Sequence, residues 1–314
     1  MPVLCALLLT LGADPGVAAK PPMPVILDTD IGDDIDDTWA LSVLLKSPEV
    51  DLKLVVGDFG NTAYRARIVA KLLDRAGRSD VAVGLGLDPS DRGGRQAPWI
   101  ADYPLTKYPG KVLHDGAQAI VDTVMASPTP VTIIAIAPPP TLAEALRRQP
   151  QIAAKARLVG MFGSLRRGYG GPKPDAEWNV KANPAAAKAV LSAPWDITIT
   201  PLDTCGLVHL TGGGYAALRD SADPVVAHMI ENYRVWCGAK PQDAQHGSST
   251  LFDTVAAYLA ISTDLCVMED LNVTVTDDGF TKIDPQGKMM HCATGWKDLD
   301  GYYGWLVRRL LTGH

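Results

Sequence analysis

Residues 25 to 37 read VILDTDIGDDIDD, and this segment is the most informative of the chain. Its first three residues are apolar, as in a buried strand, and six aspartates then fall within ten residues. A helical pattern begins at Asp37. An apolar strand that leads through a polar turn into a helix is typical of α/β proteins, which bind ligands at the carboxyl ends of their strands. We call residues 28–37 the acidic segment and take it as the leading candidate for a functional site.

The same alternation of strand and helix continues along the chain. Short β-branched runs predict strands at 24–27, 52–57, 81–84, 131–136, 158–161 and 197–201. Ala/Leu-rich stretches between them predict helices at 37–46, 63–76, 116–126, 141–148 and 184–193. Nearly all-apolar strands, each followed by a helix, indicate an open, mostly parallel sheet with helices on both faces and a Rossmann-like core. A hairpin is expected where 271–276 and 280–283 flank Asp277-Asp278-Gly279, and the long loop 88–111 is expected to be a lid or binding element.

Composition excludes several classes of protein. The chain has 314 residues, 47% of them hydrophobic, with 29 Lys and Arg against 35 Asp and Glu. A net charge of −6 argues against nucleic acid as a partner, because nucleic-acid footprints are basic. No apolar stretch reaches the 18 residues of a membrane-spanning helix. We expect no membrane association in the mature protein, and a homo-oligomer is left open.

The N-terminus resembles a secretory signal. Residues 3–11 form an apolar run, and small residues at 17–19 precede Lys20, although nothing basic comes before the run. We expect residues 1–19 to be a signal peptide, 20–314 to form a single catalytic domain, and the protein to be secreted or periplasmic. The cysteines left after cleavage allow up to two disulfides in three connectivities, among which the sequence does not choose: Cys205, Cys237, Cys266 and Cys292.

Six carboxylates in one turn repel one another unless a cation removes that cost. Aspartate is a hard oxygen donor and no Cys or His accompanies the acidic segment, so Ca²⁺ or Mg²⁺ is favoured over zinc.

Other motifs can be checked by their spacing. An EF-hand loop requires a glycine at its sixth position and a glutamate at its twelfth. Counted from Asp28, these positions hold Asp33 and Trp39, so an EF-hand is excluded. The glycines at 84 and 86 are not followed by the third glycine of the dinucleotide-binding fingerprint, so that motif is discarded. A Mg²⁺ phosphohydrolase with Asp28 as nucleophile stays open.

The acidic segment resembles the N-terminal signature of the nucleoside hydrolases, also called inosine-uridine preferring nucleoside hydrolases. Five further blocks resemble that family in matching order: VGDFGN at 56–61, AIAPPPTLA at 135–143, MFGS at 161–164, AEWN at 176–179 and LFD at 251–253. The resemblance implies the family's fold and a hydrolase that cleaves the N-glycosidic bond of small-molecule nucleosides to ribose and free base.

The resemblance also implies roles for individual residues. One Ca²⁺ would be bound by carboxylates at Asp30, Asp37 and Asp253 and by a main-chain carbonyl at Pro140. The ribose hydroxyls would be held by Asn61, Glu177 and Asn179. Asp36 matches the base that takes a proton from the attacking water.

The pattern departs from the family around the leaving base. Phe252 stands where the classical family has a histidine that can protonate the base, and it cannot donate a proton. Smaller changes fall at Ala137, Thr141, Ser164 and Gly171. We expect aromatic residues to stack on the base in place of that histidine, with Trp99 and Trp236 as candidates beside Tyr103 and Tyr233, and His246 as a replacement acid. The alternative to an enzyme is a protein of the same fold that binds a ribosyl ligand without cleaving it.

Overall fold

The computed structural model describes residues 21–87 and 93–314. The predicted signal peptide and the first part of the 88–111 loop lie outside the described residues. Within them, no helix is long and apolar enough to cross a membrane.

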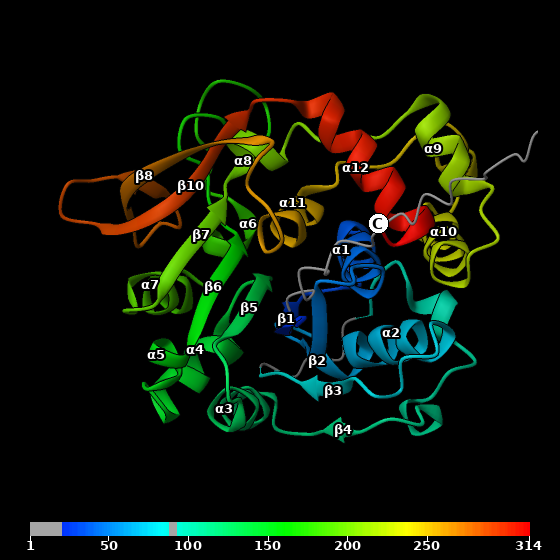
Figure 1. The fold of residues 1–314 in the computed structure, drawn as a ribbon, viewed down its shortest axis with the longest axis horizontal. Coiled ribbons are helices and arrows are strands. Elements are labelled where there is room, and N and C mark those ends of the chain that lie inside the picture. The colour runs from blue at the N-terminus through cyan, green and yellow to red at the C-terminus, as the bar shows by residue number, and fades with distance from the viewer. Residues whose placement is uncertain (1–20, 88–92) are drawn as a thin grey trace, which may run out of the picture.

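The described residues form a sheet of ten strands (Figure 1). The strands are β1 (Met23–Thr29), β2 (Val50–Gly57), β3 (Ala82–Leu85), β4 (Val112–Leu113), β5 (Val131–Ile136), β6 (Ala156–Met161), β7 (Asp196–Thr200), β8 (Cys266–Val275), β9 (Thr281–Ile283) and β10 (Lys288–Trp296). Their order is β4-β3-β2-β1-β5-β6-β7-β10-β8-β9. In this order, the strands from β4 to β10 run parallel to one another, whereas β8 pairs antiparallel with both β10 and β9. The prediction of an open, mostly parallel sheet is confirmed.

Helices cover both faces of this sheet (Figure 1). One face carries α1 (Asp36–Leu45), α2 (Thr62–Arg75), α8 (Leu202–Cys205), α9 (Gly212–Arg219), α10 (Pro224–Trp236), α11 (Phe252–Leu259) and α12 (Leu299–Thr312). The other carries α3 (Gly116–Ala126), α4 (Pro140–Arg148), α5 (Ile152–Lys155), α6 (Trp178–Lys181) and α7 (Pro184–Ser192). Short 3-10 helices lie at η1 (Ala97–Ile100), η2 (Leu105–Lys107) and η3 (Pro241–Gln245).

The central strand β1 shows why residues 25–27 are all apolar. Val25 and Leu27 belong to the core beneath α1 and α2, whereas Ile26 belongs to the core on the opposite face. Successive side chains of a strand point to opposite faces, so a strand covered on both sides must be apolar throughout. All three residues are fully buried.

The topology places a binding crevice at the end of β1. From β1 the chain moves outward through β2, β3 and β4, and it then returns to the other side of β1 with β5. Open α/β sheets bind ligands where the direction of winding reverses in this way. Thr29, at the end of β1, is paired with Ile136, at the end of β5. The acidic segment therefore begins at the crevice.

The predicted strands, helices and hairpin are all present, with small differences at their ends. Three features of the sheet were not predicted. The short strand β4 lies at one edge, and β8 begins at Cys266 and is longer than the predicted hairpin arm. Strand β10 lies between β7 and β8, parallel to the first and antiparallel to the second. The four cysteines within the described residues are free, and all except the half-buried Cys237 are buried.

Candidate functional site

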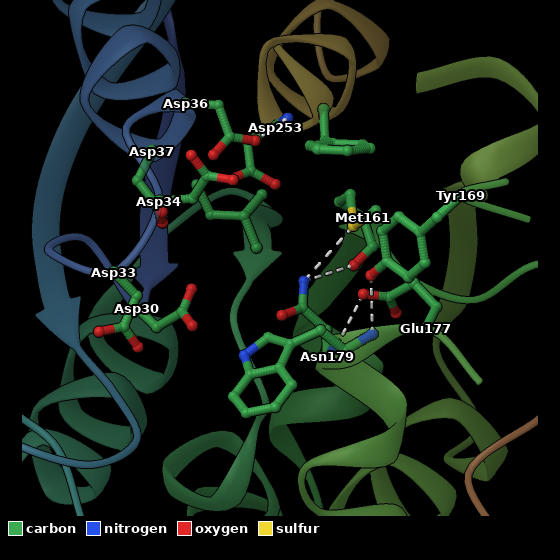
Figure 2. A pocket seen from close by; sticks show the side chains of 13 residues that line it. Asp30, Asp33, Asp34, Asp36, Asp37, Met161, Tyr169, Glu177, Asn179 and Asp253 are labelled. Carbon is green, nitrogen blue, oxygen red and sulfur yellow. Dashed lines mark hydrogen bonds between the residues drawn. The ribbon is translucent and has the colours of Figure 1, made fainter. Parts of the chain in front are cut away.

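A cavity of about 140 Å³ lies at the carboxyl ends of β1, β5 and β6 (Figure 2). Its lining combines acidic, amide and aromatic side chains from segments far apart in the chain. The lining residues are Asp30, Asp33, Asp34, Asp36, Asp37, Ile136, Met161, Tyr169, Glu177, Trp178, Asn179, Phe252 and Asp253.

The acidic segment is held in its turn by two neighbouring elements. The Thr29 hydroxyl donates to Asp37 Oδ1 at 2.5 Å, which ties the end of β1 to the first turn of α1. From α2, the Arg65 guanidinium donates to the main-chain oxygens of Asp30 and Ile31 and pairs with Asp33 at 2.9 Å. The turn is therefore set by fixed donors, and Asp30, Asp34 and Asp36 of the acidic segment also line the cavity.

Asp253 joins the acidic segment from the start of α11. Its main-chain N–H donates to Asp36 Oδ2 at 3.1 Å, across 217 positions of sequence. Carboxylate oxygens of Asp36, Asp37 and Asp253 lie within 4.8 Å of one another, and each of these side chains is at most 4% exposed. Asp30, 6% exposed, lines the same cavity. We call Asp30, Asp36, Asp37 and Asp253 the carboxylate cluster (Figure 2).

The carboxylate cluster is electrostatically strained when no cation is bound. Two like charges 4–5 Å apart repel by about 3–4 kcal/mol at an effective dielectric constant of about 20. Burial, with the neighbouring carboxylates, raises the pKa of Asp36, Asp37 and Asp253 well above the usual range. Burial also raises the pKa of Asp30 to about 6, against the opposing effect of Arg65. A divalent cation would relieve this repulsion, and a donor set made only of oxygens fits a hard ion such as Ca²⁺ or Mg²⁺.

The opposite wall of the cavity comes from the end of β6 and the start of α6. The two carboxylate oxygens of Glu177 accept the main-chain N–H groups of Gly163 at 2.9 Å and Asn179 at 2.7 Å. The Asn179 amide donates to the main-chain oxygen of Met161 at 3.0 Å, which leaves its own oxygen directed into the cavity (Figure 2). Burial raises the pKa of Glu177 to about 7. These side chains form a polar wall facing the carboxylate cluster.

Aromatic rings border the cavity between these two walls. Tyr169 contacts Phe252 edge-to-face, with ring centroids 6.0 Å apart, and Trp178 contacts Phe59 in the same way at 6.2 Å. Tyr169 is 55% exposed and Trp178 is 48% exposed. Sequence reasoning did not single out Tyr169, which lies in the loop between β6 and α6.

Comparison with known proteins agrees with this geometry. Residues 25–299 match the family model described as inosine-uridine preferring nucleoside hydrolase. The chain belongs to the nucleoside hydrolase family. It is therefore an N-glycosidase of the ribohydrolase type, and the function expected from the resemblance is confirmed at that level.

Individual relatives of this nucleoside hydrolase differ in the bases that their names mention. A probable uridine nucleosidase 2 from Oryza sativa subsp. japonica is 31% identical over 229 residues, which cover 68% of this chain and 67% of the relative. A plant nucleoside hydrolase structure superposes with a TM-score of 0.78 at 21% identity, covering 93% of this chain and all of that one. The structure of a purine-preferring ribonucleoside hydrolase from Gardnerella vaginalis superposes with a TM-score of 0.74 at 24% identity, covering 92% of this chain and 98% of that one. The structural matches support the fold.

Most of the expected site residues of this nucleoside hydrolase line the cavity. The structure brings together all four members of the carboxylate cluster with Glu177 and Asn179. The residues that line the cavity do not include Pro140, which opens α4, but they include Ile136 at the end of β5.

Three expected substrate contacts do not line this cavity and are held elsewhere. Trp99 lies on η1 and is only 3% exposed. The Lys71 ammonium lies over its ring, 4.8 Å from the ring centroid, so this indole cannot stack on a base in the cavity. Asn61 caps α2, where its side-chain oxygen accepts the Tyr64 N–H at 2.9 Å, and it does not line the cavity. The buried Tyr103 is likewise held elsewhere, with its hydroxyl bonded to Asp74 at 2.9 Å.

Trp236 and His246 line a second, open depression of about 940 Å³ that also includes Tyr233. The two hollows share a wall, because the Trp236 indole N–H donates to the main-chain oxygen of Asp33 at 2.9 Å. Asp28, by contrast, is fully buried and does not line the cavity. This placement argues against the phosphohydrolase alternative, in which Asp28 would attack the substrate.

Proposed function

We propose that this protein is a calcium-dependent nucleoside hydrolase that cleaves ribonucleosides to ribose and free base. The observation that carries the proposal is the meeting of four carboxylates from two distant segments with Glu177 and Asn179 around one cavity. The family supplies the class of reaction, and the side chains of the cavity supply the details that follow.

The size of the cavity suits the sugar better than the whole substrate. At about 140 Å³ it is smaller than the roughly 300–1,000 Å³ of pockets that enclose a complete small ligand. A ribosyl group would fill it, and the base would project through the aromatic border. Cleavage of the N-glycosidic bond develops positive charge on the sugar, and an acidic cavity stabilises that charge.

The ion would be held by Asp30, Asp37 and Asp253, with the main-chain oxygen of Pro140 or Ile136 as a further ligand. When bound, it supplies a hard positive charge that orients vicinal hydroxyls and makes water a better nucleophile. The Thr29 hydroxyl fixes Asp37 for this role, and α11 delivers Asp253 from the far side.

Asp36 would be the general base. One of its oxygens accepts the Asp253 N–H, which fixes the orientation of the carboxylate, and the other remains available for a proton. Burial raises the pKa of Asp36 well above the usual range in the ion-free protein, whereas a nearby cation would favour the ionised carboxylate, which is the form that accepts a proton. Because Asp36 also lies within reach of the metal-binding oxygens, its role must be separated from that of Asp37 by experiment.

The base would leave toward the depression that contains Trp236 and His246. Phe252 offers a ring edge and no proton, so activation of the base must come from elsewhere on that side. Trp236 is fixed against Asp33 at the shared wall, which makes it the better placed of the two expected contacts.

A panel of purine, pyrimidine and nicotinamide ribosides tests the proposal. With calcium present, we expect reducing sugar to be released from at least one of them, release to stop with a chelator, and activity to return with Ca²⁺. Release of no sugar from any riboside would overturn it. Saturable heat without product in calorimetry would instead support the binding protein, the second candidate, which the replacement of the family's histidine by Phe252 favours.

We also propose that the protein is exported. The support is the apolar run at residues 3–11 followed by small residues at 17–19. Expression of the full chain, fractionation of the cells and N-terminal sequencing test this proposal. An exported product that begins near Lys20 is expected, and an uncleaved protein in the cytosol would contradict it.

A further inference from the structure

Tyr169 is the one tyrosine among the residues that line the cavity. Its ring is 55% exposed, although its edge contacts Phe252. Its hydroxyl lies against the start of α6, where it accepts the main-chain N–H of Trp178 at 3.1 Å. Figure 2 shows this hydroxyl on the same wall as Glu177, across the cavity from the carboxylate cluster.

The loop that carries Tyr169 is braced from within. Gly168 and Gly171 exchange main-chain hydrogen bonds, one of them at 3.0 Å. The Tyr169 N–H donates to Asp175 Oδ2 at 2.8 Å, and the Asp175 N–H donates to the Ser164 hydroxyl at 2.9 Å. A side chain at Gly168 would collide with the Asp175 carboxylate, so the brace requires glycine there. The loop therefore holds a largely exposed aromatic residue in a fixed position, which core packing does not explain.

The hydroxyl of Tyr169 has a proton to donate. A phenol carries one O–H donor and can accept through its lone pairs. The Trp178 N–H occupies an acceptor position, and no acceptor for the Tyr169 proton is found within residues 21–87 and 93–314. Both oxygens of the adjacent Glu177 already accept main-chain N–H groups. A bound molecule with a hydroxyl group at this wall would supply the missing acceptor.

The chemistry of a ribosyl group says which hydroxyl this is. Its vicinal 2′,3′ pair is the part that a hard cation and carboxylates hold best, so that edge would face the carboxylate cluster. The remaining hydroxyl, on the 5′ carbon, then extends to the opposite wall. We propose that Tyr169 donates a hydrogen bond to the 5′-hydroxyl and makes the protein selective for ribosides that carry it. The inference rests on the proposed function and deepens it.

Two consequences for substrate choice follow. A 5′-deoxyribonucleoside lacks this acceptor, so its complex loses the hydrogen bond from Tyr169. A nucleoside 5′-monophosphate brings a negative charge to Glu177 inside an acidic cavity, so it is expected to be rejected. The protein would therefore act on free nucleosides with an intact 5′-hydroxyl.

The test compares two substrates in two variants. Tyr169→Phe removes one oxygen atom and keeps the ring against Phe252. Tyr303→Phe is the matched control, because it removes a tyrosine hydroxyl that does not line the cavity. For the best nucleoside of the panel, we expect Tyr169→Phe to lower kcat/KM roughly tenfold, the effect of one good hydrogen bond. For its 5′-deoxy analogue, wild type and Tyr169→Phe should differ less than twofold. The Tyr303→Phe control should have the same kcat/KM as the wild type on both substrates.

Other outcomes overturn the inference. Equal losses on both substrates would place Tyr169 at the leaving base, and no loss on either would give it no role in binding. If the wild type cleaves nothing, the proposed function fails by itself, and calorimetry with the same two nucleosides still decides the role of Tyr169. A preference for the 5′-hydroxyl that disappears in Tyr169→Phe is then expected, and an unchanged preference would refute it.

Discussion

Asp36 and Asp37 are adjacent in sequence but are held by different partners. Asp37 accepts the Thr29 hydroxyl inside the acidic segment, whereas Asp36 accepts the main-chain N–H of Asp253. We predict that Asp37→Asn loses both calcium binding and turnover. Asp36→Asn should keep calcium affinity within a few-fold and lose roughly 10²–10⁴ in kcat, the usual contribution of a general base. Calorimetric titration with Ca²⁺ and a reducing-sugar assay measure the two properties separately.

The control for this pair is Asp80→Asn, which removes a carboxylate from a surface ion pair with Arg78. It should leave both properties unchanged, since exposed ion pairs contribute little. If Asp36→Asn abolished calcium binding while Asp37→Asn kept it, the roles of base and ligand would have to be exchanged. The grouping of Asp36 with Asp37 and Asp253 in the structure makes this comparison necessary.

The sequence predicted site residues best where a short motif fixes them. The acidic segment and the Glu177 block are local patterns whose side chains come directly off strand ends, so their positions follow from the fold. Tyr169 was missed because its place depends on the Asp175 brace, a contact that no periodicity reveals. Trp99 was misplaced because its loop turns inward and buries the indole under Lys71.

At the scale of elements, the turn between β1 and α1 depends on Gly32. Its φ of +121° is unfavourable for other residues, and an added side chain would press on the Tyr64 ring. We predict that Gly32→Ala destabilises the protein by about 1–3 kcal/mol and weakens calcium binding, because the turn must shift to relieve the clash. Urea unfolding and calorimetry measure the two effects.

Gly77→Ala separates these two causes. Gly77 also has a positive φ, +67°, but an added side chain there would meet no atom within 4 Å. It should cost about 1 kcal/mol in stability and leave calcium affinity unchanged. Equal calcium affinity in both variants would show that the acidic segment does not depend on the shape of this turn.

The central elements were predictable from sequence and the peripheral ones less so. Strands β1, β5 and β6 are covered on both faces, which forces apolar runs that stand out. Strand β10 mixes buried with partly exposed residues and contains Lys288 and His291, so no apolar run in the sequence indicates this strand. Its place beside β7 follows from long-range pairing rather than from a local pattern.

For the whole molecule, the free cysteines give a direct prediction. All four cysteines of the described residues are free, and Cys205, Cys266 and Cys292 are buried. We predict that a reductant leaves the Tm of the folded protein unchanged, because no disulfide among these cysteines is lost. Calorimetric scans with and without reductant test this expectation. A drop in Tm on reduction would mean that the folded protein pairs these thiols in solution.

The carboxylate cluster is built from opposite halves of the chain, so a bound ion would link distant parts of the molecule. The acidic segment follows the first strand, β1, whereas Asp253 lies in the first turn of α11, more than 200 residues later. Without an ion, these halves meet through mutually repelling carboxylates. Binding of an ion to the folded state alone stabilises that state by mass action. Calcium is therefore expected to raise the stability of the entire fold.

The size of that stabilisation should depend on pH. In the ion-free protein, burial raises the pKa of Asp30 to about 6 and raises those of Asp36, Asp37 and Asp253 further above their unfolded values. A raised carboxyl pKa gives stability that is present at low pH and is lost as pH rises through the folded value. Calcium binds the deprotonated carboxylates and releases these protons, so its affinity rises over the same range.

We therefore predict that the difference in Tm between calcium-loaded and chelated protein grows as the pH rises from about 4, the usual carboxyl value, through about 6, the raised pKa of Asp30, and beyond. The chelated protein should lose Tm over this interval, while the calcium-loaded protein changes less. Thermal scans in matched buffers measure both curves, and Asp37→Asn, which lacks an ion ligand, should show no calcium effect at any pH. A difference that is constant or larger at acid pH would mean that calcium binds without displacing protons from the carboxylate cluster, which would place the ion elsewhere.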